Sequence, residues 1–176
     1  KDVGGDQAHD FDAEAVSGAS ATDTGVAGSF ALNVVDGDTQ ASMQGDVAAG
    51  TEAVSLTAVS TSSSDVSATA NATGDTGVGA SVGINVVDQL TEAVVADNAA
   101  LTGGTSLTLS ATGSHEATTV AKGGAGDNGS GGATSIGGGI AITVADHKTD
   151  ASIGTSTTGI NVGSGAVSAT ATHHGS

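Results

Sequence analysis

The sequence predicts an all-β fold, and within that class a parallel β-helix or β-solenoid built from about three repeats of 52–58 residues. One observation behind this prediction is a segment that recurs at nearly constant spacing, and another is the alternation of bulky with small or polar residues inside each copy. The third is composition, because 29 of the 176 residues are glycine and only Phe11 and Phe30 are drawn from Phe, Tyr and Trp. We therefore expect a thin interior and a narrow, repetitive cross-section.

The repeat is clearest between residues 23–41 (DTGVAGSFALNVVDGDTQA) and 75–93 (DTGVGASVGINVVDQLTEA), which are identical at 11 of 19 positions. A fainter copy at 133–151 matches the first at 7 of 19 positions, and the interval before it is the longer of the two. We expect the extra residues in a Gly-rich surface insertion at 123–132. The predicted organisation is an N-terminal extension at 1–12, one solenoid domain at 13–172 with repeats at about 13–62, 63–114 and 115–172, and a tail at 173–176.

The first strand of each repeat carries bulky residues at every second position, which indicates a strand with one bulky face. We expect this face to point inward and to stack as ladders. Its members are Phe30, Leu32 and Val34, then Val82, Ile84 and Val86, then Ile140, Ile142 and Val144.

Two further kinds of strand follow in each repeat. A short one contains Ala41 and Met43 and their equivalents, and a longer one alternates aliphatic residues with Ser or Thr at 54–62, 66–73, 106–114 and 166–174. Helix is poorly supported, because Gly, Ser, Thr and Val dominate. Since the repeat is long for one coil, we expect two coils per repeat and about six in total.

Two other interpretations compete with the solenoid. A β-sandwich of antiparallel strands that polymerises by strand exchange is one, although it does not require similar strands at fixed spacing. Disorder is the other, since acidic chains with few aromatic residues are often unfolded. Hydrophobic residues reach 37% and are placed periodically, so we expect mobility only in residues 1–12 and 123–132.

Charge restricts the partners. Nineteen acidic residues against three lysines give a net charge of −16, which repels nucleic acid and anionic membrane surfaces and attracts cations. No stretch is long enough for membrane insertion, and the absence of cysteine excludes disulfides and thiolate metal sites. The chain opens on Lys1 without a signal segment, and we interpret it as a piece of a longer protein.

The stretches GVGASVGINVVD and TEAVVADNAALTGGTSLTLSATG resemble the tandem β-helix repeats of large bacterial surface or secreted proteins, the filamentous-haemagglutinin-like and autotransporter-type adhesins. The resemblance covers most of residues 13–172 and is one of composition and rhythm. It implies an elongated scaffold, extracellular or at the cell surface, with a host or neighbouring-cell surface as partner. It transfers no functional residue.

Enzymatic patterns are weak. GASVG at 79–83 fits the G-x-S-x-G nucleophile pattern, but Ser81 lies inside a strand and no helix follows it. The histidines are scattered without a zinc motif, and a zinc site requires long-range convergence; they are His9, His115, His147, His173 and His174. We therefore expect no enzymatic activity and no required cofactor.

Calcium is the candidate cation. Asp36 and Asp38 follow a predicted strand, and Asp88 and Asp146 are the equivalents of Asp36 in the other copies. A solenoid stacks these carboxylates along an outer edge where calcium, which takes six to eight oxygen ligands, can bind. Aspartate also ends strands simply because it favours turns. The segment GGAGDNGSGG at 123–132 resembles half of a calcium-binding repeat.

Outward threonines suggest one more function. Thr69, Thr108 and Thr170, with Thr57, Thr73, Thr112 and Thr172, fall on the Ser/Thr side of their strands, and regular outward threonines on a flat β-solenoid are typical of ice-binding proteins. Threonine is equally an ordinary surface residue of strands. The leading expectation is a non-enzymatic structural or adhesive segment that self-associates into a fibre through strand edges. Ice binding and a calcium-dependent extracellular module are the alternatives.

Overall fold

A computed structural model describes residues 8–126, 134–155 and 159–175. All regular structure in these residues is β-strand. The strands are β1 (Ala8–Ser20), β2 (Thr24–Met43), β3 (Val47–Gly50), β4 (Ala53–Thr73), β5 (Thr76–Val95), β6 (Leu101–Gly103), β7 (Ser106–Gly126), β8 (Thr134–Ile153), β9 (Ile160–Asn161) and β10 (Ala166–Gly175). No helix in this part of the chain is long and apolar enough to cross a membrane.

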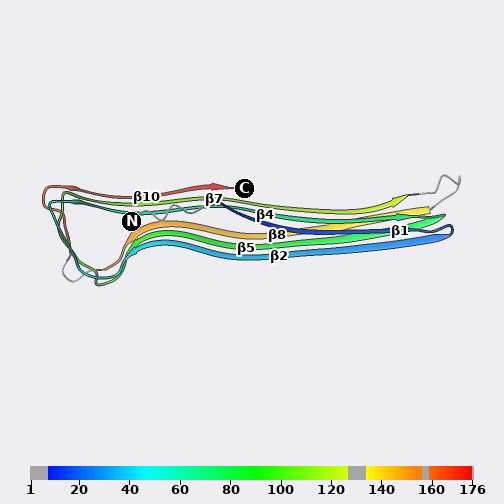
Figure 1. The fold of residues 1–176 in the computed structure, drawn as a ribbon, viewed down its shortest axis with the longest axis horizontal. Helices are drawn as coiled ribbons and strands as arrows, with labels where there is room; N and C mark the ends of the chain where they lie inside the picture. Colours follow the sequence, from blue (N-terminus) through cyan, green and yellow to red (C-terminus); the bar gives the residue numbers. More distant parts are fainter. Residues whose placement is uncertain (1–7, 127–133, 156–158, 176) are drawn as a thin grey trace.

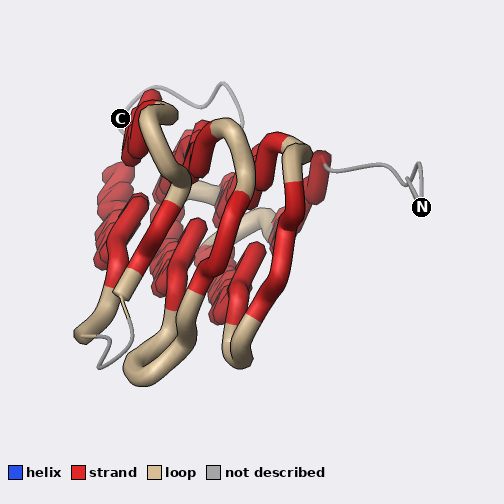
Figure 2. Tube along the Cα trace, turned by 90° about the vertical axis from the view of Figure 1, so that its left-hand side faces the viewer, coloured by secondary structure: helices blue, strands red, loops and turns tan. Residues whose placement is uncertain are grey.

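The strands form three sheets in which every pairing is parallel. Their orders are β1-β4-β7-β10, β2-β5-β8 and β3-β6-β9. The chain follows a long strand of the first sheet, turns into a long strand of the second, crosses the third short sheet and returns to the first. Figure 2 shows the coils stacked side by side, and Figure 1 shows the two long sheets facing each other. The predicted parallel β-solenoid is confirmed, and the antiparallel sandwich is excluded for the described strands.

Each repeat makes one coil. Thr24 pairs with Thr76 and Thr76 pairs with Thr134, so residues one repeat apart are direct neighbours in the sheet. The prediction of two coils per repeat, and six in total, is wrong because the strands are long. Two strands of 20 and 21 residues consume almost a whole repeat.

The structure describes only the first part of the predicted glycine-rich insertion at 123–132. Residues 123–126 continue β7 to its end at Gly126, opposite Thr73. The remainder of the predicted insertion, 127–132, lies outside the described residues, as do residues 1–7 of the predicted extension. Residues 8–12 belong to β1, and 173–175 belong to β10.

The face that we expected inside is outside. Phe30 and Val34 are 58% and 67% exposed. Ala31 and Val35, each the next residue in the chain, are only 4% and 5% exposed. The same alternation runs through β5, where Ser81, Gly83, Asn85 and Val87 are buried. The bulky ladders therefore lie on the outer surface of the β2-β5-β8 sheet, and the small and polar residues fill the interior.

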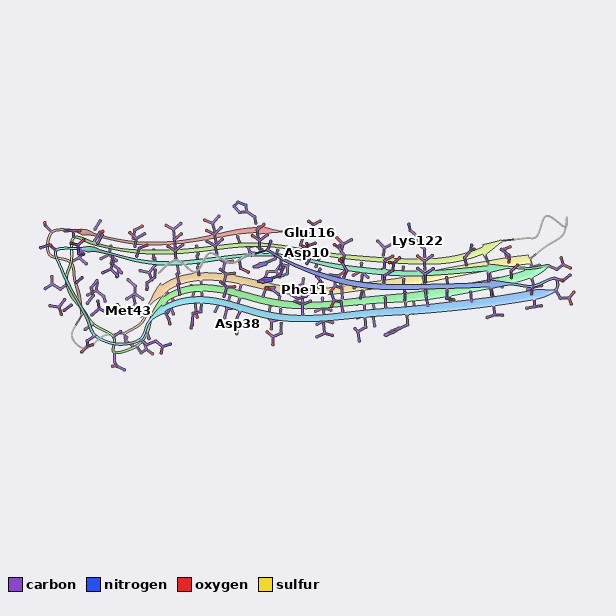
Figure 3. The ribbon with its side chains drawn as sticks, viewed as in Figure 1. Asp10, Phe11, Asp38, Met43, Glu116 and Lys122 are labelled. Carbon is purple, nitrogen blue, oxygen red and sulfur yellow. The ribbon has the colours of Figure 1, made fainter. Side chains whose placement is uncertain are left out.

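Close approach of the sheets explains this inversion. A Cβ added at Gly79 would overlap the carbonyl oxygen of Gly124, and one at Gly123 would overlap that of Gly138. There is no room for a valine or isoleucine where backbones meet this closely. The sheets diverge only towards the short sheet, where Leu101, Leu107 and Leu109 are fully buried. Met43 points between the layers there, and Lys122 and Asp38 point away from them (Figure 3).

Candidate functional site

Between the glycine-lined part and the leucine-lined part, the interior contains many polar side chains beside a few valines and alanines. Asn85 is fully buried; its Nδ2 donates to the backbone carbonyl of Ser64 at 2.8 Å, and its Oδ1 accepts from Ser64 Oγ at 2.8 Å. Asn33, one coil earlier, donates to the same Ser64 Oγ at 2.9 Å. The repeated asparagine of NVVD thus ties the two long sheets together across the interior.

Further along the same strands, three histidines from three different strands meet. His115 lies on β7, His147 on β8 and His173 on β10, and all three project into the interior between the long sheets. The ring centroid of His115 is 5.2 Å from that of His147 and 5.7 Å from that of His173, and the third pair is also 5.7 Å apart. We call these three residues the histidine cluster.

Hydroxyl groups surround the cluster. Ser62 Oγ lies 2.9 Å from His115 Nδ1 and Thr91 Oγ1 lies 3.4 Å from its Nε2, while Thr149 Oγ1 lies 3.2 Å from His173 Nδ1. A hydroxyl can donate or accept, so it satisfies either nitrogen of a neutral imidazole. His147 Nε2 is buried and has no hydrogen-bond partner among the described residues.

The cluster disfavours protonation. Burial, followed by charge repulsion from His147 and then His173, lowers the pKa of His115 to about 4. Burial and repulsion from His173 also lower the pKa of His147, while the carboxylates of Asp146 and Asp88 act in the opposite direction. His115 is only 2% exposed. At neutral pH we therefore treat His115 and His147 as uncharged.

The chemistry that the geometry of this cluster supports is proton uptake. Neutral imidazoles are metal ligands in many proteins, but in the described residues no group of three or more His, Asp or Glu side chains is arranged to hold a metal ion. Beside the cluster, on the outside of the first sheet, is a hollow of about 250 Å³ lined by acidic, hydroxyl and imidazole groups, among them Asp10, Glu116 and His174. His115 is itself one of the residues that line this hollow.

The predicted calcium residues lie on the outer face of the second sheet. Asp36, Asp88 and Asp146 pair in register across β2, β5 and β8, so their carboxylates form a column about 4.8 Å apart. The column is in the middle of the strands rather than at the predicted strand ends. Asp38 does not extend it, because its neighbours in register are Leu90 and Lys148.

The predicted ice-binding residues share the outer face of the first sheet. Thr69 lies on β4, Thr108 on β7 and Thr170 on β10, each on the side away from the interior. Hydroxyl side chains stand in register near the latter two: Ser55, Thr108 and Ser168 form one row and Thr57, Ser110 and Thr170 the next. Thr69 is distant from these rows and pairs with Val16 and Lys122.

The serine of the G-x-S-x-G pattern is an interior residue. Ser81 is 2% exposed and lies in the middle of β5, and its Oγ has no hydrogen-bond partner among the described residues. No base in the described part of the chain is positioned to activate it.

Sequence reasoning missed the histidine cluster. His115, His147 and His173 are far apart in the chain and match no motif, so only the stacking register brings them together. A weak signal existed: placing the repeats in register sets His147 beside Gln89 and Gly37, two positions on the small, inward side of their strands.

Comparison of the chain with protein-family models, with curated proteins and with solved structures returns no match.

Proposed function

We propose that this chain is a non-enzymatic structural segment of an extracellular bacterial surface or filament-forming protein. It is a stiff, flat β-solenoid that self-associates through its exposed strand edges. In the larger assembly it acts as a scaffold towards a host or neighbouring cell. The resemblance to adhesin repeats, which includes the acidic, cysteine-free composition, supports the cellular setting.

The observation that carries the self-association is the pair of long edge strands. β2 and β8 border the second sheet, and each is 20 residues long without a proline. The free side of such a strand presents unpaired N–H and C=O groups that can pair with another chain. The inward side of β8 is also exposed from Thr134 to Asp146, so a strand added there gains side-chain contacts as well as hydrogen bonds.

Proline substitution tests the edge. Consecutive residues of a strand point their N–H groups to opposite sides, so of Lys148→Pro and Thr149→Pro, which pair with Leu90 and Thr91 of β5, one removes a donor from the free edge and the other a donor from the ladder with β5. We expect the wild type to form fibres at high concentration by electron microscopy and light scattering. The variant that keeps the β-sheet circular dichroism spectrum should lose fibres. A wild type that stays monomeric at high concentration contradicts the proposal.

Ice binding is the second candidate, and the registered hydroxyl rows on β4, β7 and β10 favour it. The wild type should then show thermal hysteresis, Thr108→Tyr should abolish it, and Thr76→Tyr on the other long sheet should retain it. Absence of thermal hysteresis in the folded wild type rejects this candidate.

A further inference from the structure

The outer surface of the β2-β5-β8 sheet is a continuous apolar area. We describe it in rows, each a set of three residues that pair across β2, β5 and β8 and named after its β5 member. Four rows contain only large aliphatic or aromatic side chains, and together we call them the aliphatic face. They are Val26, Val78 and Ile136; Phe30, Val82 and Ile140; Leu32, Ile84 and Ile142; and Val34, Val86 and Val144.

These side chains are exposed to an unusual degree. On the two border strands, Val26 is 66% exposed, Val34 67%, Ile136 59% and Ile140 57%. Burying such residues is normally what stabilises a fold, at about 25 cal/mol per Å² of apolar surface. Here the interior is too thin to accept them, and contiguous apolar patches of this kind mark interaction sites.

The aliphatic face has a relief that can match itself. Between the Val78 row and the Val82 row lies the Ala80 row, made of Gly28, Ala80 and Gly138, and this row is a trough. On the other side of the Val82 row lies the Ile84 row, which is a ridge of one leucine and two isoleucines. Trough and ridge are equidistant from the Val82 row.

Charge fixes the direction in which two such faces can meet. The Asp88 row, a column of three carboxylates, borders the aliphatic face at one end, and the Thr76 row, three threonines, borders it at the other. If two copies met with strands parallel, three carboxylates would face three carboxylates, which is unfavourable. With strands antiparallel, each Asp88 row faces a Thr76 row.

We propose that the aliphatic face binds the same face of a second copy of this chain, about a two-fold axis that runs along the stacking direction of the coils through the Val82 row. This axis places the Ile84 ridge of each copy in the Ala80 trough of the other. The Val78 row then faces the Val86 row, and the Thr76 row faces the Asp88 row. One symmetry operation satisfies shape and charge together, as an isologous interface requires.

The area implies a weak dimer. The proposed interface consists of the aliphatic face, the Ala80 row and the bordering Thr76 and Asp88 rows. It extends about 40 Å along the strands and about 15 Å across them, or roughly 600 Å² per copy at ordinary strand spacings. Two such faces bury roughly 1,200 Å², the lower limit for specific interfaces. With a net charge of −16 on each chain, we expect a dissociation constant on the order of 10 µM or weaker, tightened by salt that screens the repulsion.

Sedimentation velocity over a concentration series tests the dimer, with circular dichroism as the check on folding. Ile84→Asp places a charge on the ridge of the central strand and should weaken the dimer by at least roughly tenfold. Val16→Asp makes the same kind of change at an exposed position of β1, on the other long sheet, and should leave the dimer unchanged. A monomeric wild type at all concentrations, or equal effects of the two variants, overturns the proposal.

Two more variants separate the proposed geometry from general stickiness. Ala80→Leu makes the surface more apolar but fills the trough, so the specific dimer should weaken by at least roughly tenfold whereas unspecific association would strengthen. Thr76→Lys brings a lysine opposite the partner's Asp88 only in the antiparallel arrangement, and should tighten the dimer in a salt-sensitive way. Stronger association of the Ala80→Leu variant, or a Thr76→Lys dimer no tighter than that of the wild type, overturns the proposed geometry.

This interface is independent of the proposed edge pairing. Ala80 and Ile84 lie on the central strand β5, whereas fibres grow from β2 and β8. Loss of fibres in the proline variants with the dimer retained, or the reverse, therefore tells which of the two proposals fails.

Discussion

Acidification should weaken the fold through the histidine cluster. The pKa of His115 is about 4 in the folded protein against an ordinary value of 6.5, so the unfolded chain holds this proton more tightly than the folded one. The contribution of the neutral imidazole to stability is then complete above about pH 6.5, and it is lost as pH falls towards 4. His147, whose pKa is also lowered, acts in the same direction.

The loss of stability on acidification follows from the difference between the pKa of His115 in the folded protein and its ordinary pKa. At about 1.4 kcal/mol per pKa unit, His115 can contribute at most about 3 kcal/mol over the full range. The hollow next to His115 is open to solvent, and solvent screens the charge, which reduces the expected loss between about pH 7.5 and about pH 5 to roughly 1–2 kcal/mol.

Denaturant titrations followed by circular dichroism at several pH values measure this loss. His115→Gln removes the buried titrating group and should flatten the dependence of the unfolding free energy on pH between about 7 and 5. His174→Gln changes an exposed histidine one residue from the cluster and should keep the wild-type slope. Protonation of the many surface carboxylates affects all three proteins alike. Equal slopes for wild type and His115→Gln would refute the reasoning.

Three other predictions concern the interior and the acidic column. Gly79→Ala forces a Cβ against backbone and should lower the unfolding free energy by roughly 1–3 kcal/mol, whereas Gly45→Ala, where nothing lies within 4 Å of the new Cβ, should be nearly neutral in the same titration. Asn85→Ala leaves buried partners unsatisfied and should cost about 1–3 kcal/mol, against little change for the exposed Asn71→Ala. Asp88→Asn relieves repulsion in the carboxylate column and should raise the unfolding free energy by about 0.5 kcal/mol at low salt. If added calcium raises the melting temperature of the wild type, the rise should be smaller in this variant. A rise of the same size in both proteins would place the calcium elsewhere.

The stacking of the coils could be predicted from the sequence because it depends on spacing alone. Similar segments at nearly constant intervals predict similar strands in register, and the paired positions Asn33 and Asn85 are the same ones that sequence alignment equates. The thin interior was equally predictable, since glycine, alanine and serine leave little volume to fill.

The orientation of the strands could not be predicted from alternation. Period two separates two faces but does not say which is inside, and the usual preference for buried bulky residues gave the wrong answer. The decisive fact is the contact between backbones at Gly79 and Gly124, which depends on how two different sheets meet. Glycines concentrated on one side of β5, at Gly77, Gly79 and Gly83, were the available clue.

The histidine cluster also depends on how the two long sheets meet, which the sequence does not reveal. Its members come from both long sheets, so their meeting requires the register within each sheet and the alignment between sheets. The interval from β5 to β8 is longer than that from β2 to β5, and no local pattern around His147 reveals what faces it.

The spacing of the paired strands also determines how this chain can fold. Every β-ladder in the described residues joins positions about one full repeat apart, and none is closed by a hairpin. Asp10 pairs in its ladder with Ser63, so the pairing can form only after the chain has run through a full coil, and nucleation requires two coils to form at once. The relative contact order is roughly 0.3 for the ladder contacts, beyond the range of most small β-proteins. Once two coils exist, each further coil adds to a ready template. Refolding should therefore be slow to start and quick to propagate, with a wide hysteresis between the unfolding and refolding curves.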